Sequence, residues 1–358
     1  MARAKEVPIL TGIRGLAAVL VFVSHAMNEC YQGKYFGDGG GQLGVMLFFI
    51  LSGYLMSMLY LERLPSRASA YKFLINRFSR IYPMFFVVVM ANYAIARFCP
   101  TISHYSINNT SDLIEHLLFI KGYSVLWTIG PEVIFYGLFV GLWWLRPKGD
   151  IYFYVGIAVL VMASTLPGGN DISNSFASLH NRVPYFIAGM LLATKHPSLK
   201  EASSKLSLLA RFILAAASAM AIVICMPRIM AVGSPNMLNA VLKHSVNVWS
   251  EPFYLVAMVF TLVALIVANP TILTNRAAIF MGNISFSFYL LHALVISFTY
   301  HTFPEHPGSV IALSFLAAVA LSATTYALIE KPSRRFLRSL FKENRSDNTL
   351  KADGTASA

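Results

Sequence analysis

Charged residues are scarce in this sequence. Asp, Glu, Lys and Arg make up 12% of its 358 residues, whereas soluble domains average about 25%. Hydrophobic residues make up 56%, and apolar runs of roughly 18–25 residues recur along the chain. Each such run is long enough to cross a hydrocarbon core about 30 Å thick. The composition therefore excludes an ordinary soluble domain and predicts a protein whose solvent is the lipid bilayer.

Cysteines are few, and internal repeats are not visible. Cys30, Cys99 and Cys225 are too few and too irregularly spaced for a disulfide scaffold or a zinc site, so we expect no metal. The first apolar stretch lacks a small-residue cleavage site and carries Arg14 near its start, so we expect a retained helix rather than a signal peptide. The missing repeat disfavours a transporter built from two similar halves.

The apolar runs predict about ten membrane-spanning helices. They lie at residues 10–27, 43–61, 81–98, 133–145, 151–166, 183–193, 206–226, 252–268, 278–303 and 310–329. The fourth and sixth runs are short, so their helices must borrow neighbouring residues or tilt. Four prolines, where a missing N–H costs little, are expected at the starts of crossings: Pro83, Pro131, Pro184 and Pro252. The expected fold is an all-α polytopic membrane helix bundle over residues 1–342, with a disordered cytoplasmic tail at 343–358.

The basic residues are distributed unevenly along the chain. The net charge is +12, and most of the 28 Lys and Arg residues fall on alternate loops. The exceptions are Lys34, Arg97, Lys121, Arg182, Arg228 and Lys243. This asymmetry follows the positive-inside rule, so we expect both termini in the cytoplasm and the basic charge over the inner lipid surface rather than on a nucleic acid.

The first crossing carries two ionisable residues, Arg14 and His25. They are separated by about three helical turns, or roughly 16 Å, on nearly the same face. Ionisable side chains inside a membrane are costly, which makes both residues candidates for function. We expect Arg14 near the inner surface and His25 towards the outer surface. A snorkelling arginine and a structural histidine are the alternatives.

A second pair, Arg77 and Arg80, shares a helix face where the chain is expected to re-enter the membrane from the cytoplasm. Guanidinium groups bind phosphate oxygens bidentately, so the pair is suited to hold a nucleotide-bearing donor such as coenzyme A. Ordinary positive-inside anchors would show the same spacing.

Glu132 directly follows Pro131 and is expected at the outer mouth of a crossing, beside Trp127. A carboxylate there could partner an imidazole or a substrate hydroxyl, or it could simply stabilise a helix N-terminus. Trp127 suits either a substrate contact or the interfacial aromatic belt.

A third group, Ser285, Tyr289 and His292, is spaced at three and four residues and therefore shares one helix face. We expect this face to border a substrate cavity. A packing stripe would give the same spacing, and His292 could bond a neighbouring carbonyl. Glu330 with Arg334 is expected to be structural.

Six segments occur in an order typical of one family. They are residues 11–15 with Ser24 and His25, 48–54, 77–83, 127–136, 284–292 and 330–332. Together they resemble the transmembrane acyltransferase 3 family over nearly the whole chain, in its single-domain form without a fused outer esterase-like domain. The resemblance places Arg14 and His25 at the family's paired basic and histidine positions, Arg77 and Arg80 at its cytoplasmic arginine motif, and Glu132 at its outer acidic motif. Pro131 stands where many members carry another residue.

The resemblance implies a multi-pass enzyme of the bacterial cytoplasmic membrane. Such an enzyme moves an acyl group, usually acetyl, from cytoplasmic acetyl-coenzyme A to a hydroxyl of a surface glycan, glycolipid or other acceptor. Acyl-CoA is then a co-substrate, and no cofactor is bound permanently. A transporter or flippase for a lipid-linked glycan is the alternative, and the acceptor, the acyl length and homo-oligomer formation stay open.

In the mechanism that we expect, coenzyme A phosphates lie at Arg77 and Arg80. His25 takes the hydroxyl proton or carries the acyl group transiently. Arg14 guides the donor or holds a charge pair, and Glu132 orients His25 or the sugar.

Overall fold

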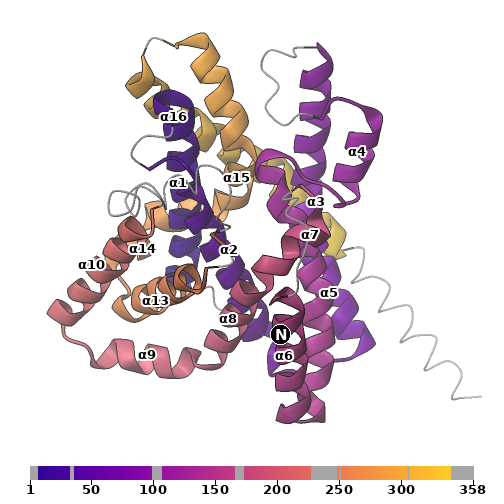
Figure 1. The fold of residues 1–358 in the computed structure, drawn as a ribbon, viewed down its shortest axis with the longest axis vertical. Helices are drawn as coiled ribbons and strands as arrows, with labels where there is room; N and C mark the ends of the chain where they lie inside the picture. The colour runs from indigo at the N-terminus through magenta and orange to yellow at the C-terminus, as the bar shows by residue number, and fades with distance from the viewer. Residues whose placement is uncertain are drawn as a thin grey trace, which may run out of the picture.

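The computed structural model describes residues 7–32, 36–98, 107–165, 173–226, 248–249, 251–304 and 306–339. The regular elements within these ranges are helices, which confirms the all-α class (Figure 1). Lys121 and Asn174 form an isolated antiparallel β-bridge. The tail expected at residues 343–358 lies outside the described residues.

Six helical spans in the described part of the chain are long and apolar enough to cross a bilayer. They are Pro8–Tyr31, Gly41–Leu61, Arg67–Phe98, Ser124–Lys148, Arg276–Thr302 and Pro307–Ser339. Three shorter apolar helices accompany them: α6 (Asp150–Thr165), α10 (Leu208–Ile224) and α13 (Pro252–Ala268). Length and composition therefore define a multi-pass membrane protein.

The long spans contain the main helices labelled in Figure 1. These are α1 (Pro8–Tyr31), α2 (Gly41–Met56) with a π-helical end (Ser57–Leu61), α3 (Arg67–Phe98), α5 (Ile129–Leu145) between 3₁₀ turns at Ser124–Thr128 and Arg146–Lys148, α15 (Arg276–Thr302), and α16 (Pro307–Thr325) with a π-helical turn at Tyr326–Glu330. The remaining elements are α4 (Thr110–Leu117), α7 (Ser175–Leu179), a 3₁₀ turn (His180–Arg182), α8 (Val183–Thr194), α9 (His196–Lys205) and α14 (Thr271–Thr274). Figure 1 shows α9, α10 and α13 on one side of α1 and α2, with α3, α5 and α6 on the other.

The ten apolar runs of the sequence fall on helices. The fourth run is extended by the 3₁₀ turns on either side of α5 into a span of 25 residues. For the sixth, α8 has 12 residues but follows α7 and a 3₁₀ turn without a break, so the helical path runs from 175 to 194. The expected borrowing of neighbouring residues is confirmed for the fourth run. Within the residues that the structure describes, six spans meet the length of a crossing, fewer than the ten that the sequence predicts.

One proline expectation is wrong. Pro83 lies inside α3, which begins at Arg67 and runs for 32 residues, rather than at the start of a crossing. Pro83 therefore removes a backbone hydrogen bond to the carbonyl of Ser79 within a continuous helix. Pro184 and Pro252 do lie in the first turn of their helices, as expected.

α1 packs against α15 in the centre of the bundle (Figure 1). A Cβ atom on Gly282 would lie 1.9 Å from the carbonyl oxygen of Thr11, so only glycine allows the two backbones to approach this closely. Such contacts drive helix association in membranes, because lipid offers no hydrophobic gain. Further along both helices the rings of Phe22 and Phe288 lie 5.7 Å apart. The contacts follow the same order along both helices, so α1 and α15 run parallel.

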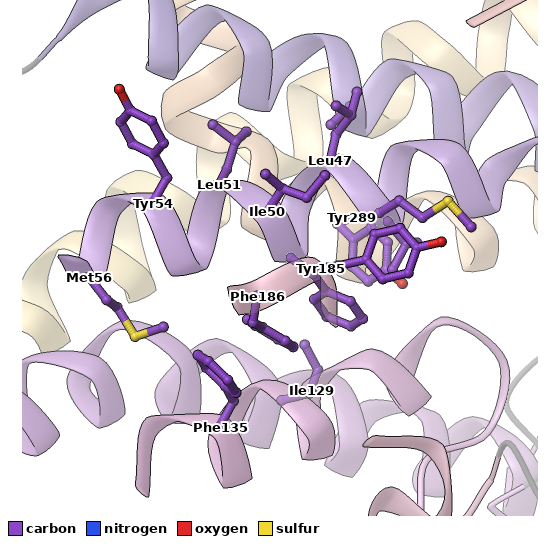
Figure 2. Packing of buried hydrophobic residues seen from close by; sticks show 14 of the residues in the cluster. Leu47, Ile50, Leu51, Tyr54, Met56, Ile129, Phe135, Tyr185, Phe186 and Tyr289 are labelled. Carbon is purple, nitrogen blue, oxygen red and sulfur yellow. The ribbon is translucent and has the colours of Figure 1, made fainter. Parts of the chain in front are cut away.

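Aromatic rings join α2, α5 and α8. Phe135 and Phe186 stack with their centroids 4.2 Å apart, and Phe186 also stacks on Phe49 at 4.5 Å. Figure 2 shows Phe135 and Phe186 side by side beneath the α2 residues Ile50 and Leu51. Each aromatic pair contributes about 0.5–1.5 kcal/mol beyond its buried area. The stack therefore fixes the position of α2 relative to α5 and α8.

Several helices expose apolar side chains on their outer faces. On α6, Val155, Val159 and Met162 follow one another at helical spacing and are exposed. On α10, Phe212 and Ile213 are exposed in the same way. Soluble monomers rarely expose contiguous apolar faces of this kind, so these surfaces are suited to contact lipid.

Candidate functional site

A partly open cavity between α1, α2, α3, α5 and α15 comprises about 660 Å³ of space free of protein atoms, counted together with the space at its opening. Its polar lining residues are Arg14, Ser52, Arg77, Arg80, Thr128, Glu132, Ser285 and Tyr289. Three guanidinium groups and one carboxylate therefore face a single volume, and the cavity carries an excess of positive charge. Ionisable groups inside membrane proteins usually face such cavities and mark the path of a substrate. This lining suits an anionic molecule and does not suit a metal cation.

Arg14 reaches the cavity from α1. Its Nη2 atom donates a hydrogen bond to Ser285 Oγ on α15 at 3.0 Å. Ser285 Oγ in turn donates to the carbonyl of Gly282 at 2.8 Å. The close approach of α1 and α15 at Gly282 therefore also sets the position of the Arg14 guanidinium.

Glu132 lies in the first turn of α5, one residue after Pro131. A proline in that turn costs no helical hydrogen bond, and the helix N-terminus favours the carboxylate. Its Oε1 atom accepts hydrogen bonds from Ser52 Oγ at 2.8 Å and from the Tyr136 hydroxyl at 2.7 Å. No donor among the described residues reaches Oε2.

Glu132 packs against the middle of α2. Its partner Ser52 lies eleven residues after the first residue of α2, about 17 Å along the helix axis. The 3₁₀ turn Ser124–Thr128 forms the first part of the span that contains Glu132, and α5 begins only at Ile129.

Arg77 and Arg80 lie in the interior of α3. α3 begins at Arg67, so Arg77 lies ten residues, or about 15 Å, inside the helix. The Arg77 guanidinium carbon is 5.6 Å from the ring centroids of both Phe73 and Tyr136. Tyr136 thus contacts Arg77 through its ring and Glu132 through its hydroxyl. The predicted arginine pair and the predicted acidic residue belong to one connected unit.

His25 and His292 are not among the residues that line the cavity. Their rings lie edge to face with centroids 5.1 Å apart, so α1 and α15 bring them together. His292 Nδ1 donates to the carbonyls of Phe288 and Tyr289 at 3.2 and 2.7 Å, which confirms the bond to a neighbouring carbonyl. The ring of Tyr289, which does line the cavity, lies 5.8 Å from that of His292.

Trp127 does not line the cavity either. It lies behind Phe49, with the ring centroids 6.3 Å apart, and Phe49 forms part of the cavity wall. Of the predicted site residues, six therefore meet in the cavity: Arg14, Arg77, Arg80, Glu132, Ser285 and Tyr289. His292 and Trp127 contact residues of its walls, and His25 contacts His292.

Ser52 was missed as a site residue. Ser52 follows Leu51 and does not stand in a Gly-x-Ser-x-Gly elbow, so its sequence context does not mark it as a nucleophile. The structure gives it a different contact, a hydrogen bond to Glu132. A hydroxyl inside an otherwise apolar helix is a usable signal, since such groups bond across helices in membranes.

The fold and the cavity define a polytopic membrane protein with a buried, positively charged site. A model of the acyltransferase 3 domain matches residues 7–327. The chain therefore belongs to this acyltransferase family, as the ordered motifs predict. The matched region contains every residue of the cavity.

The chain is also similar to bacterial proteins that are named as O-acetyltransferases. O-acetyltransferase OatA of Staphylococcus aureus (strain NCTC 8325 / PS 47) is 22% identical over 92% of this chain and 58% of its own length. Peptidoglycan O-acetyltransferase OatA of Listeria monocytogenes is 27% identical over 54% of this chain and 34% of its own length. The chain thus spans little more than half the length of the Staphylococcus aureus relatives and about a third of that of the Listeria relative. No solved structure matches it.

Proposed function

We propose that the protein is a membrane O-acetyltransferase that takes an acyl group from cytoplasmic acyl-CoA and delivers it to a hydroxyl of a cell-surface glycan or glycolipid. The observation that carries this proposal is the cavity in which Arg14, Arg77 and Arg80 face Glu132. A polyanionic donor needs the cationic lining, and a hydroxyl acceptor needs a hydrogen-bond acceptor beside it. Membership of an acyltransferase family agrees with both needs.

On the donor side, Arg77 and Arg80 hold phosphate oxygens of coenzyme A. The Arg77 guanidinium is buried beside two aromatic rings, which hold it in one orientation. Arg80 is half-buried, so its side chain is free to change orientation. Both lie well inside α3, so the pantetheine arm has a short path to the cavity centre. Arg14, tied to Ser285, stands on the facing helix and is placed to contact the thioester carbonyl oxygen.

On the acceptor side, Glu132 orients the attacking hydroxyl. Oε1 is occupied by Ser52 and Tyr136, and Oε2 faces a place for one further donor. The acceptor oxygen forms a bond to the thioester carbon, the carbon–sulfur bond breaks, and coenzyme A leaves as the thiol after the hydroxyl proton has been passed on.

His25 is the proton acceptor in this scheme. It adjoins the cavity through His292 and Tyr289 and is not itself a wall residue, so it acts from the edge of the cavity or after a rotation of its side chain. A neutral imidazole near physiological pH is suited to take the proton, or to carry the acyl group between two transfers.

The membrane arrangement follows the distribution of charge. Parallel α1 and α15 require an odd number of crossings between them, and the ten-crossing order supplies seven. Basic residues on alternate loops then support cytoplasmic termini in a bacterial cytoplasmic membrane. The Listeria relative is named for peptidoglycan, which supports a cell-wall or other surface glycan as the acceptor.

Sealed vesicles of known orientation test this function. With acetyl-coenzyme A trapped on the cytoplasmic side, we expect the labelled acetyl group to appear on glycan fragments added to the opposite side. Vesicles carrying the Glu132→Gln variant are the control for background transfer. Movement of lipid-linked glycan without acetylation would instead identify a flippase. Equal transfer from donor added outside intact vesicles would contradict the cross-membrane route.

A further inference from the structure

Arg182 is a buried cation that the proposed chemistry does not use. It ends the 3₁₀ turn before α8 and is 2% exposed. Its Nε and Nη2 atoms have no hydrogen-bond partner, and no carboxylate of the described residues pairs with it. Burial of a charge without a partner is costly, and native structures rarely leave such donors unsatisfied. A ligand that supplies the acceptors would explain the arrangement.

Two tryptophans hold the guanidinium in place. The Arg182 Cζ atom lies 4.9 Å from the ring centroid of Trp127 and 4.8 Å from that of Trp249. Cation–π contacts stabilise the charge, but they leave the N–H donors at the edge of the guanidinium plane without acceptors. A guanidinium stays protonated in proteins, so the side chain is cationic at neutral pH.

A further unsatisfied donor lies beside this cation. The Tyr185 hydroxyl is buried without a hydrogen-bond partner, and its ring lies 5.0 Å from the Trp249 ring. Figure 2 shows the Tyr185 ring pointing away from the stacked Phe135 and Phe186. We call Arg182, Trp127, Trp249 and Tyr185 the Arg182 cluster. Its unpaired donors and its positive charge are complementary to an anion.

The Arg182 cluster adjoins the cavity on the side where α2 begins. Trp249 Nε1 donates to Oε1 of Gln42, the second residue of α2, at 3.0 Å. Phe49, seven residues or about 10 Å further along α2, contacts Trp249 at 5.6 Å and lines the cavity. Phe49 therefore separates the cluster from Ser52 and Glu132. The charge distribution of the sequence assigns the start of α2 and Arg182 to the outer side.

We propose that the Arg182 cluster binds an anionic group, a carboxylate or a phosphate, carried by the sugar acceptor. The inference rests on the proposed function, because it assigns the outer side of the cavity to the acceptor. The guanidinium fork pairs with either anion bidentately. The two tryptophan rings supply flat apolar faces against which the sugar ring packs.

Intrinsic tryptophan fluorescence tests the site directly, because two of the four tryptophans of the chain belong to the cluster. The purified full chain is titrated with glucuronic acid, glucose 1-phosphate and neutral glucose. We expect a saturable change with at least one anionic sugar and none with glucose at the same concentration. The carboxylate and phosphate arms show which anion is preferred. Arg182→Gln should weaken that binding about tenfold or more.

Arg63→Gln is the matched control, since Arg63 also lies over an aromatic ring, that of Tyr60, but is exposed. It should bind the anionic sugar as the unchanged protein does. An equal response to glucose and to both anionic sugars would overturn the inference, and this comparison needs no variant to fold. So would unchanged binding by a folded Arg182→Gln variant. Anionic binding without acetyl transfer to any acceptor would refute the proposed function and leave the anion site standing.

Discussion

The Gly282→Ala substitution tests whether the α1–α15 contact positions the site. The new Cβ atom would lie 1.9 Å from the Thr11 carbonyl oxygen, a backbone atom that cannot rotate away. Carbon–oxygen contacts between helices normally measure about 3.3–3.6 Å, so the helices must separate by about 1.4 Å or more. The hydrogen bond from Arg14 to Ser285, now 3.0 Å long, would then be broken.

We expect two measurable effects of this separation. Overpacking should lower the free energy of unfolding by about 1–3 kcal/mol, measured as the midpoint of thermal unfolding of the purified protein. Displacement of the Arg14 guanidinium by more than about 1 Å should lower kcat/KM for acetyl transfer by about 10²-fold.

Two further glycines calibrate the result. An alanine Cβ at Gly137 has nothing within 4 Å, so Gly137→Ala should leave both stability and activity unchanged. At Gly15 the nearest atom would be the Gly282 backbone nitrogen at 3.0 Å, so Gly15→Ala should be intermediate. If Gly282→Ala behaves like Gly137→Ala, the close backbone contact does not position the site and the reasoning is refuted.

Three further outcomes are expected. His25→Ala should insert normally and lose acetyl transfer by at least about 10²-fold, and activity above about a tenth would exclude general-base catalysis by this residue. Arg80→Ala should raise the KM for acetyl-coenzyme A more than the KM for the acceptor. Arg67 is exposed at the start of the same helix, so Arg67→Ala should raise neither KM. An equal effect of both substitutions would reduce Arg80 to a topology anchor. Burial lowers the pKa of His116, whose Nε2 accepts a hydrogen bond from the Tyr123 N–H at 3.1 Å. The stability that His116 contributes is therefore full above about pH 6.5 and is lost as the pH falls through its lower folded-state pKa. Hydrogen exchange at the Tyr123 amide, corrected for intrinsic exchange, should accelerate below about pH 6.5, and an unchanged rate would contradict this.

Helical periodicity predicts which residues share a face, and here it works. Arg14 and His25 both contact α15, through Ser285 and His292 respectively, as their common face requires. Ser285 and Tyr289 of the expected face line the cavity, whereas His292 does not. The same spacing also suits a packing stripe, and only the contacts with neighbouring helices distinguish a cavity-lining face from a packing stripe.

Periodicity does not predict depth along a helix. Hydropathy marks a run of residues, but the point at which the run becomes helical depends on local turns. α5 begins at Ile129, after a 3₁₀ turn, and α3 begins at Arg67, well before the apolar run at 81–98. Arg77 and Glu132 line one cavity. Ser52 and Arg182 became visible only through contacts between helices, which a single sequence does not encode.

The order of contacts along α2 constrains the acceptor further. Gln42 bonds Trp249 beside the Arg182 cluster, Phe49 forms the partition, and Ser52 bonds Glu132. Ten residues separate Gln42 from Ser52, about 15 Å along the axis. An acceptor that places its anionic group at the cluster and its reacting hydroxyl at Glu132 must therefore extend well beyond one sugar ring. Acidic oligosaccharides should accept acetyl groups with a lower KM than the corresponding acidic monosaccharide, and equal KM values would show that the two sites do not hold one acceptor at the same time.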